Sequence, residues 1–205
     1  GCWVHSAHKD GRDVGEVIGR APRGVTATTS EQDLLDLDAD AVVYSPVMAD
    51  PGMVVRILRS GKNVVTPLGW FYPEAGERAR MDGAAKEGGV TLHGTGIHPG
   101  GITERFPLMV SALSNAITCV RAEEFSDIRT YDAPDVVRHV MLFGATPEAA
   151  AGSIMLDVLG AGFIQSVHMV ADTLGFRLDA ELTTSHEVAV ATAPIDSPIG
   201  PIEPG

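Results

Sequence analysis

The sequence has few of the features that hold small secreted domains together or bind polyanions. Its 205 residues include only two cysteines, Cys2 and Cys119, whose spacing matches no metal or redox motif. This is typical of a reducing compartment, and we expect a cytoplasmic protein. The 27 acidic residues against 15 basic ones give a net charge of −12, which argues against a nucleic-acid or anionic-membrane partner. No stretch resembles a signal peptide or a membrane span, and the most apolar run, residues 154–174, predicts a buried helix.

Several chemical signatures are also missing. The chain has no G-x-G-x-x-G dinucleotide fingerprint and no G-x-S-x-G nucleophile elbow. His93 and His98 lack an obvious third ligand, so we predict no metal site. The first residue is not Met, and residues 1–6 have the pattern of a strand that begins before residue 1. A Pro/Gly-rich stretch ends the chain. We therefore expect both ends to be cut from a longer protein, with the glycine-rich loop upstream.

What the sequence contains is an alternation of short β-branched runs and helical segments over its first half. Helices are expected to begin at Ser30, at Asp50-Pro51 and at residue 74. The second of these is predicted to have an apolar stripe of Met53, Val54, Ile57 and Leu58, and the third to face inward with Ala75, Ala79 and Ala84. This alternation predicts an α/β fold, a parallel Rossmann-type sheet lacking its first strand and glycine-rich loop. The expected strands are residues 1–6, 24–28, 41–46, 63–67 and 90–95.

The alternation of strand and helix patterns ends near residue 98, where we place the boundary between two domains, 1–98 and 99–205. Helices are expected over residues 101–114, 133–143 and 154–175, and strands over 117–124 and 186–193. The second domain is therefore predicted to be α+β and incomplete. Gly160 and Gly162 inside the long helix predict close packing against another element.

Ligands of open parallel sheets bind beyond the carboxyl ends of the strands. Four loops occupy such positions here, "HSAHKDGR", "SPVMADP", "TPLGW" and "GTGIHPGG", although loops that merely turn the chain would look similar. In the first loop, where NAD enzymes place a carboxylate, Ser6 is followed by Lys9 and Arg12. These cations suit a 2′-phosphate and predict NADP(H) rather than NAD(H) as cofactor. The alternative is a solvated basic loop.

Three segments, "DADAVVYSPVMAD", "VVRILRSGKNVVTPLGWFYP" and "GVTLHGTGIHPGG", resemble the dihydrodipicolinate reductase-like family, and more closely its 2,4-diaminopentanoate dehydrogenase-type branch. The resemblance covers most of residues 1–175. It implies a partial Rossmann domain over 1–98 and, over 99–205, a partial substrate domain that also mediates homo-oligomerisation. It further implies NAD(P)H-dependent reduction of a small imine or oxo acid, or oxidation of an amine.

The resemblance also implies roles for individual residues. The nicotinamide would be lined by Thr66, Pro67 and Gly69, and the cofactor flanked by Ser45, Pro46 and Met48. The site would be closed at the domain junction by Thr95, Gly96, His98, Pro99 and Gly100. We predict that His98 donates a proton to the substrate or forms a hydrogen bond with it; the alternative is that His98 only anchors its loop by bonding backbone. Pro99 and Gly100 are predicted to contact substrate, and Glu124 to face substrate unless it lies in a solvated turn.

One departure limits the resemblance. "DAP" at 132–134 is followed by Asp135-Val136-Val137, without the paired His and the Lys of the reductases proper, so the lysine-biosynthesis reaction is not assigned. A sugar dehydrogenase is an alternative, although it usually shows Glu-Lys-Pro where this chain has Val65-Thr66-Pro67. A non-catalytic dinucleotide-binding sensor or scaffold is another.

Aromatic residues are only 5% of the chain, yet Trp70, Phe71 and Tyr72 are consecutive. They are predicted either to shield the nicotinamide or to pack at the domain interface without touching a ligand.

Overall fold

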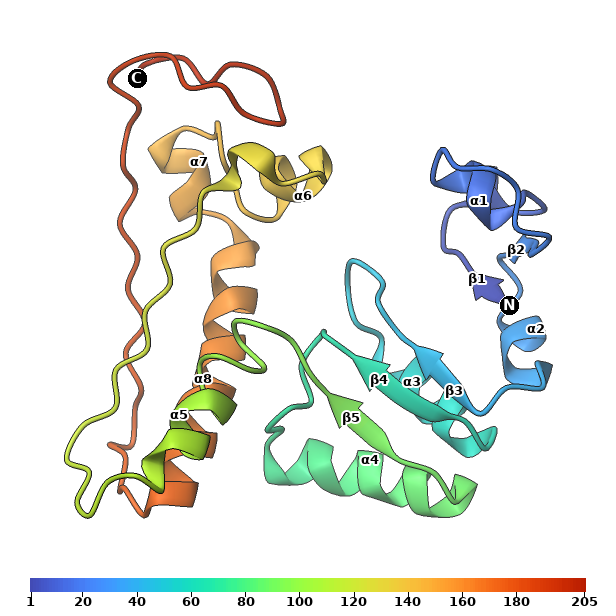
Figure 1. The fold of residues 1–205 in the computed structure, drawn as a ribbon, viewed down its shortest axis with the longest axis horizontal. Coiled ribbons are helices and arrows are strands. Elements are labelled where there is room, and N and C mark those ends of the chain that lie inside the picture. Colours follow the sequence, from blue (N-terminus) through green and yellow to red (C-terminus); the bar gives the residue numbers. More distant parts are fainter. The chain divides into compact units, whose positions relative to one another are not determined.

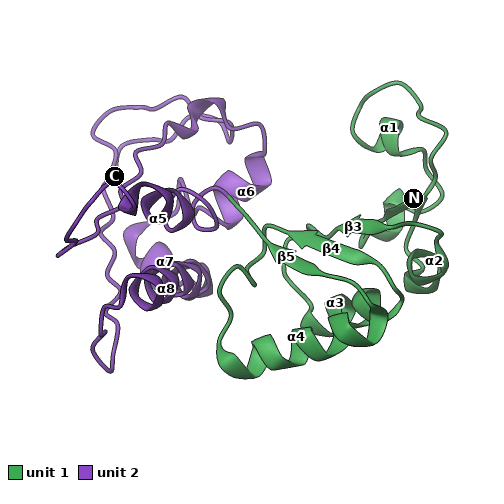
Figure 2. Cartoon of the chain, turned by 60° about the horizontal axis from the view of Figure 1, so that its bottom comes forward, with its two compact units in different colours: residues 1–96 green, residues 97–205 purple.

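The computed structural model describes all residues 1–205, and the chain divides into two compact units. Unit 1 comprises Gly1–Gly96 and unit 2 comprises Ile97–Gly205 (Figure 2). The sequence placed the boundary after residue 98. Unit 1 contains every strand of the structure, whereas unit 2 is built from helices and irregular chain.

Unit 1 alternates short strands and helices (Figure 1). β1 (Cys2–Trp3) pairs in parallel with β2 (Ala27–Thr28). A separate parallel sheet has the order β3 (Ala41–Val43), β4 (Asn63–Thr66) and β5 (Leu92–Gly94). The predicted α/β class with parallel strands is confirmed and is consistent with a Rossmann-like fold. The prediction of one sheet is wrong, because no ladder of hydrogen bonds joins the two-stranded pair to the three-stranded sheet.

The predicted helix starts of unit 1 are confirmed, two of them by a side-chain cap. The Ser30 hydroxyl accepts a hydrogen bond from the Asp33 amide at 3.1 Å at the start of α2 (Glu31–Asp36). Asp50 accepts from the Gly52 amide at 2.7 Å, and Pro51 begins α3 (Pro51–Arg59). The third, α4 (Ala75–Gly88), begins after Glu74. A 3₁₀ turn η1 (Ala7–Lys9) and a short α1 (Val14–Val17) were not predicted.

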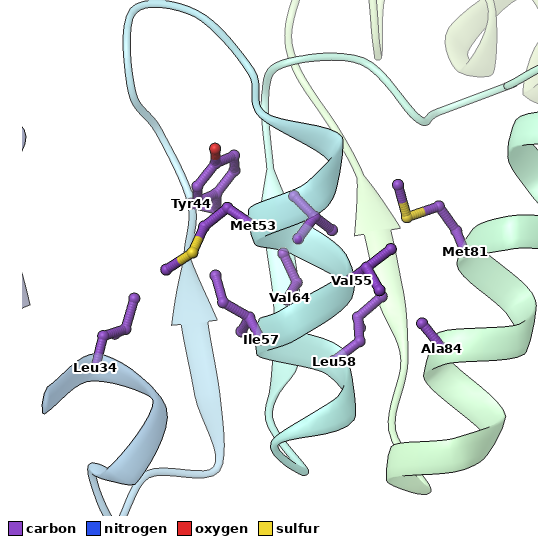
Figure 3. Packing of buried hydrophobic residues seen from close by; sticks show 10 residues of the cluster. Leu34, Tyr44, Met53, Val55, Ile57, Leu58, Val64, Met81 and Ala84 are labelled. Carbon is purple, nitrogen blue, oxygen red and sulfur yellow. The ribbon is translucent and has the colours of Figure 1, made fainter. Parts of the chain in front are cut away.

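The core of unit 1 lies where α3 and α4 cover one face of the three-stranded sheet (Figure 3). The predicted apolar stripe of α3 is confirmed, since Met53, Val54, Ile57 and Leu58 are all at most 1% exposed. The opposite face of the sheet is open, because Val43 is 79% exposed. Alternate residues of a strand point to opposite faces of the sheet, so only every second residue of β3 faces the core.

The prediction that α4 buries Ala75 and Ala79 is wrong, because both residues are exposed. The predicted burial of Ala84 is confirmed, and α4 also buries Met81. At 3.6 residues per turn, Ala75 and Ala79 lie on the side of the helix opposite this pair.

Unit 2 contains α5 (Arg105–Ser111), η2 (Ile128–Thr130), α6 (Pro134–His139), α7 (Pro147–Ala151) and α8 (Ile154–Leu174). α5 packs along α8 (Figure 1). The predicted strands at 117–124 and 186–193 are wrong, and with them the α+β class of this region. Both segments are irregular, and the only bridge in unit 2 joins Ile195 to Ile202. β-branched residues favour strands, but a strand forms only when a partner completes its hydrogen bonds.

The prediction that α8 is a buried helix is also wrong. Among its 21 residues only Ser166, Val170 and Ala171 are buried, while Ile154 is 71% exposed. By length and composition alone α8 is apolar enough to cross a membrane, a test that the core helix of a soluble protein also passes. The sequence had predicted no such segment, since polar residues interrupt this run.

Candidate functional site

Unit 2 contains a cavity of about 580 Å³ that is open to solvent on one side, a volume that suits a small molecule. Its wall is formed by the loop before α5, the irregular segment 118–122, the second half of α8 and the residues that follow it. Phe163, Val170 and Phe176 provide part of its apolar lining. The polar side chains in the wall are His98, Thr103, Thr118, Cys119, Ser166 and Arg177.

His98 is held in this wall by contacts on both ring nitrogens. Nδ1 lies 2.7 Å from the Thr103 hydroxyl, and Nε2 lies 3.3 Å from Oε2 of Glu124. The ring edge packs against Phe163 with centroids 4.9 Å apart. The carboxylate of Glu124 stabilises a positively charged ring, and the Thr103 hydroxyl can donate to Nδ1 of the neutral ring. This arrangement orients the ring from both sides, as a proton-transfer role requires.

The loop that carries His98 is positioned by α8. A side chain on Gly162 would lie 3.0 Å from the Pro99 ring, so glycine at this position lets the loop pack against the helix. This confirms for Gly162 the close packing that the sequence predicted. Gly160 has only ordinary contact distances to Thr184, so it imposes no comparable constraint.

A buried carboxylate, missed by the sequence reasoning, lies beside the cavity. Glu104 immediately precedes α5 and is fully buried. Its Oε2 accepts a hydrogen bond of 2.8 Å from the hydroxyl of Ser166 on α8, and its Oε1 has no hydrogen-bond partner. The available signal was an acidic residue between the apolar residues Ile102 and Phe106 of a predicted helix.

In unit 1, three of the predicted loops meet at the carboxyl edge of one sheet. Parallel pairing places Thr66 beside Gly94, and the Thr95 amide donates to the Thr66 carbonyl at 2.8 Å. Residues predicted to flank or line the cofactor therefore share this edge: Ser45, Pro46, Met48, Thr66, Pro67, Gly69, Thr95 and Gly96. The basic loop follows β1 instead, which belongs to the other pair of strands.

The aromatic stretch after β4 packs within unit 1. The Trp70 indole donates to Glu77 Oε1 at 3.0 Å, and the ring lies against the buried cluster around α3. A side chain on Gly94 would lie 2.2 Å from the carbonyl carbon of Trp70, so this backbone contact requires glycine. The Arg78 guanidinium lies 5.7 Å from the Tyr72 ring centroid. Trp70 and Tyr72 thus have partners in unit 1 itself.

The basic loop after β1 is tightly folded by its own backbone. The Lys9 amide donates to the Ser6 carbonyl at 3.0 Å, and the Arg12 amide to the Lys9 carbonyl at 3.3 Å. Neither Lys9 nor Arg12 forms an ion pair in the structure.

The two carboxylates of this loop are occupied by backbone amides. Asp10 accepts a hydrogen bond of 2.6 Å from Thr29, and Asp13 accepts from Gly15, Arg23 and Gly24. The hydrogen bond from the Arg23 amide contributes most to holding the pKa of Asp13 below its ordinary value. The charges of Lys9 and Arg12 are therefore left for a ligand or for solvent.

No protein-family profile matches the chain. It is 32% identical over 203 residues to an amine dehydrogenase of Streptomyces virginiae, covering 92% of this chain and 56% of that protein. It is 26% identical over 148 residues to a 2,4-diaminopentanoate dehydrogenase of Acetoanaerobium sticklandii, covering 71% of this chain and 40% of that protein. The chain therefore spans about half the length of the curated relatives it matches. Similarity to two dehydrogenases supports an oxidoreductase family.

Proposed function

We propose that the protein is an NAD(P)-dependent oxidoreductase that oxidises a small amine, or reduces the corresponding imine or oxo acid. The observation that carries this proposal is His98, which lies in the wall of the unit 2 cavity between Thr103 and Glu124. A titratable group in a cavity, oriented on both sides, is suited to proton transfer. The similarity to an amine dehydrogenase supports an amine as the substrate class.

The chain's own residues supply proton transfer and orientation in this proposal. Oxidation of an amine to an imine removes a hydride from carbon and a proton from nitrogen, and the bound dinucleotide supplies the hydride acceptor. His98 takes the proton when the substrate nitrogen replaces Thr103 or Glu124 as a partner of the ring. Glu124 then stabilises the charged imidazolium, and the packing against Phe163 keeps the ring plane in place.

The dinucleotide is proposed to bind along the carboxyl edge of unit 1. Thr66, Pro67 and Gly69 would line the nicotinamide, as the sequence resemblance implies. NADP(H) is favoured over NAD(H), because Lys9 and Arg12 have no ion-pair partner and both carboxylates of their loop accept hydrogen bonds from backbone amides. This leaves two cations that form no ion pair available for a 2′-phosphate.

A turnover assay of the full-length protein tests the proposal. We expect reduction of NADP⁺ with a panel of small primary amines, and oxidation of NADPH with oxo acids in the presence of ammonia. Turnover with polyols instead of amines would indicate a sugar dehydrogenase. Binding of NADPH without turnover on any panel member would favour a non-catalytic sensor.

A further inference from the structure

The wall of the unit 2 cavity contains one permanent charge, the guanidinium of Arg177. An arginine side chain stays protonated in proteins, and no aspartate, glutamate or lysine lines the cavity. Arg177 forms no ion pair in the structure. The acidic residues nearest to it in the chain on either side, Asp172 and Asp179, do not line the cavity. The cavity therefore has a cation with which no carboxylate of the protein pairs.

A sharp turn at the end of α8 brings Arg177 into the wall. Gly175 has a φ of 76°, a left-handed conformation that ends the helix, and the Phe176 amide donates to the Ala171 carbonyl at 2.9 Å. Phe176, Arg177 and Leu178 then line the cavity in succession. Phe176 and Leu178 are half-buried and hold the segment in place, whereas Arg177 is exposed. A ligand that enters the cavity from solvent can therefore reach Arg177.

Much of the remaining wall is apolar. α8 contributes Phe163, Val167 and Val170, and Phe176 and Leu178 follow it in the chain. Such a wall suits an aliphatic chain, and the single cation matches a single anionic group. A second anionic group on the ligand would lie against apolar side chains without a cationic partner, which is unfavourable.

A carboxylate is the anion that one arginine complements best. The planar guanidinium can donate two parallel hydrogen bonds to the two carboxylate oxygens. A phosphoryl group carries a charge of about −1.5 to −2 at neutral pH. The wall has no lysine or second arginine to balance that additional charge.

We propose that Arg177 binds the carboxylate of a monocarboxylate substrate and is a specificity-determining residue of the unit 2 cavity. The identification of this ligand as the substrate rests on the proposed function. The substrate is then an amino acid or oxo acid with one carboxylate and an apolar chain, rather than a simple amine. His98 lies in the wall of the same cavity, so both ends of such a molecule have a polar partner there.

The test measures binding in the absence of any dinucleotide. Hexanoate, hexanamide, hexylammonium, adipate and hexylphosphonate are titrated into the full-length protein by calorimetry at neutral pH. We expect hexanoate to bind most tightly. Arg177→Gln should weaken hexanoate binding at least about tenfold, because a charge-assisted contact is lost, and should change hexanamide binding much less. Arg177→Lys keeps the charge but not the planar fork, so it should restore only part of the affinity.

The matched control is Arg129→Gln, which removes the same charge from an exposed residue of unit 2 that does not line the cavity. Arg129 already pairs with Asp127 at 2.6 Å, so its loss should leave all the affinities unchanged. Arg177→Gln should melt at the wild-type temperature, because an exposed side chain without an ion pair contributes little to stability.

The inference is overturned if hexanamide or hexylammonium binds the wild type as tightly as hexanoate, or if Arg177→Gln leaves hexanoate affinity unchanged. Tighter binding of adipate or hexylphosphonate than of hexanoate would refute the assignment of a single carboxylate. The wild-type comparisons decide the matter even if the variants fail to fold.

Failure of the proposed function gives a different result. In that case hexanoate still binds through Arg177, but no amine or amino acid reduces NADP⁺. Conversely, suppose that amines reduce NADP⁺, that 6-aminohexanoate is no better a substrate than hexylamine, and that its KM is unchanged in Arg177→Gln. The proposed function would then stand, and the role of Arg177 would be refuted.

Discussion

One region of unit 2 contains His98, Thr103, Glu104 and Glu124. These residues differ in how deeply they are buried and in which partners they contact. His98 is paired with a half-exposed carboxylate and a hydroxyl, so its ring is oriented on both sides. Glu104 is fully buried, and its carboxyl group has one hydrogen-bond partner, the Ser166 hydroxyl. Of these two carboxyl groups, that of Glu124 pairs with the proposed proton carrier His98.

The role of His98 can be separated from its packing by His98→Gln. Glutamine retains hydrogen-bonding groups for Thr103 and Glu124 but cannot carry a proton at neutral pH. We expect amine oxidation to fall by roughly 10²–10⁴-fold, as for the loss of a general base, with an unchanged melting temperature. His186→Gln, at an exposed position of unit 2, is the control. Activity within a few-fold of the wild type, or a matching loss of thermal stability, would exclude proton transfer by His98.

The cofactor preference depends on two other residues, Lys9 and Arg12. In the full-length protein, Lys9→Ala with Arg12→Ala should weaken NADPH binding far more than NADH binding. Each charge-assisted hydrogen bond to the 2′-phosphate contributes roughly 1.5–3 kcal/mol, and NADH lacks that group. Fluorescence titration with both dinucleotides measures the difference, with the exposed Arg20→Ala as control. If both affinities fall equally, the loop does not recognise the 2′-phosphate.

Close backbone contacts between elements of unit 1 shape the carboxyl edge of its three-stranded sheet. β5 ends at Gly94, and the turn after β4 crosses directly over it at Trp70. Gly69 has a φ of 99° and Trp70 a φ of 55°, so the turn runs through the left-handed region at both residues. The indole hydrogen bond to Glu77 connects this turn to α4. The shape of the edge is thus determined by packing between elements more than by the loop sequence.

Two glycine substitutions test this packing with opposite expected signs. Gly94→Ala places a methyl group 2.2 Å from the Trp70 backbone, so we expect a destabilisation of about 1–3 kcal/mol and altered tryptophan fluorescence. Gly83→Ala adds a methyl group to α4 with nothing within 4 Å. It should stabilise the protein by about 0.5–1 kcal/mol, because alanine favours helix. Chemical denaturation measures both. A neutral Gly94→Ala would mean that the turn does not depend on this contact.

Across the whole molecule, buried apolar residues are distributed unevenly between the two units. The buried cluster around α3 is formed entirely by residues of unit 1. Buried apolar residues of unit 2 are few, namely Val137, Ala150, Val170 and Ala171, whereas Met109, Leu113 and Phe125 are each at least 75% exposed. Unit 1 therefore has a core of its own, and unit 2 buries much less apolar side chain around its cavity.

This distribution predicts where a core mutation acts. Leu58→Ala, at a fully buried position, should cost about 2–5 kcal/mol of unfolding free energy. We expect faster amide hydrogen exchange in α3, β4 and α4, and unchanged exchange in α8. Ile18→Ala, at a position that is 68% exposed, is the control and should change neither. An equal loss of protection in α8 would show that the two units unfold as one.

Much of unit 1 could be predicted from local sequence. The cap at Ser30, the Asp50-Pro51 start and the stripe from Met53 to Leu58 depend on short-range spacing, and the structure contains all three. The prediction that α8 is buried was wrong, because a run of apolar residues can indicate a helix but does not specify which part of the protein covers that helix. The strands expected at 117–124 and 186–193 failed because pairing depends on a partner that local sequence does not specify.

For the candidate site, the sequence by itself determined which residue types are available: a histidine beside a proline-glycine turn, cations without a carboxylate partner and small residues after the strands. Only the tertiary structure decided their surroundings. It paired His98 with Thr103 and Glu124, and it buried Glu104 against Ser166 beside a cavity. Glu104 and Ser166 are 62 residues apart in the chain. Their contact depends on how α5 packs along α8, and such packing is set by the combined fit of many side chains rather than by any local pattern.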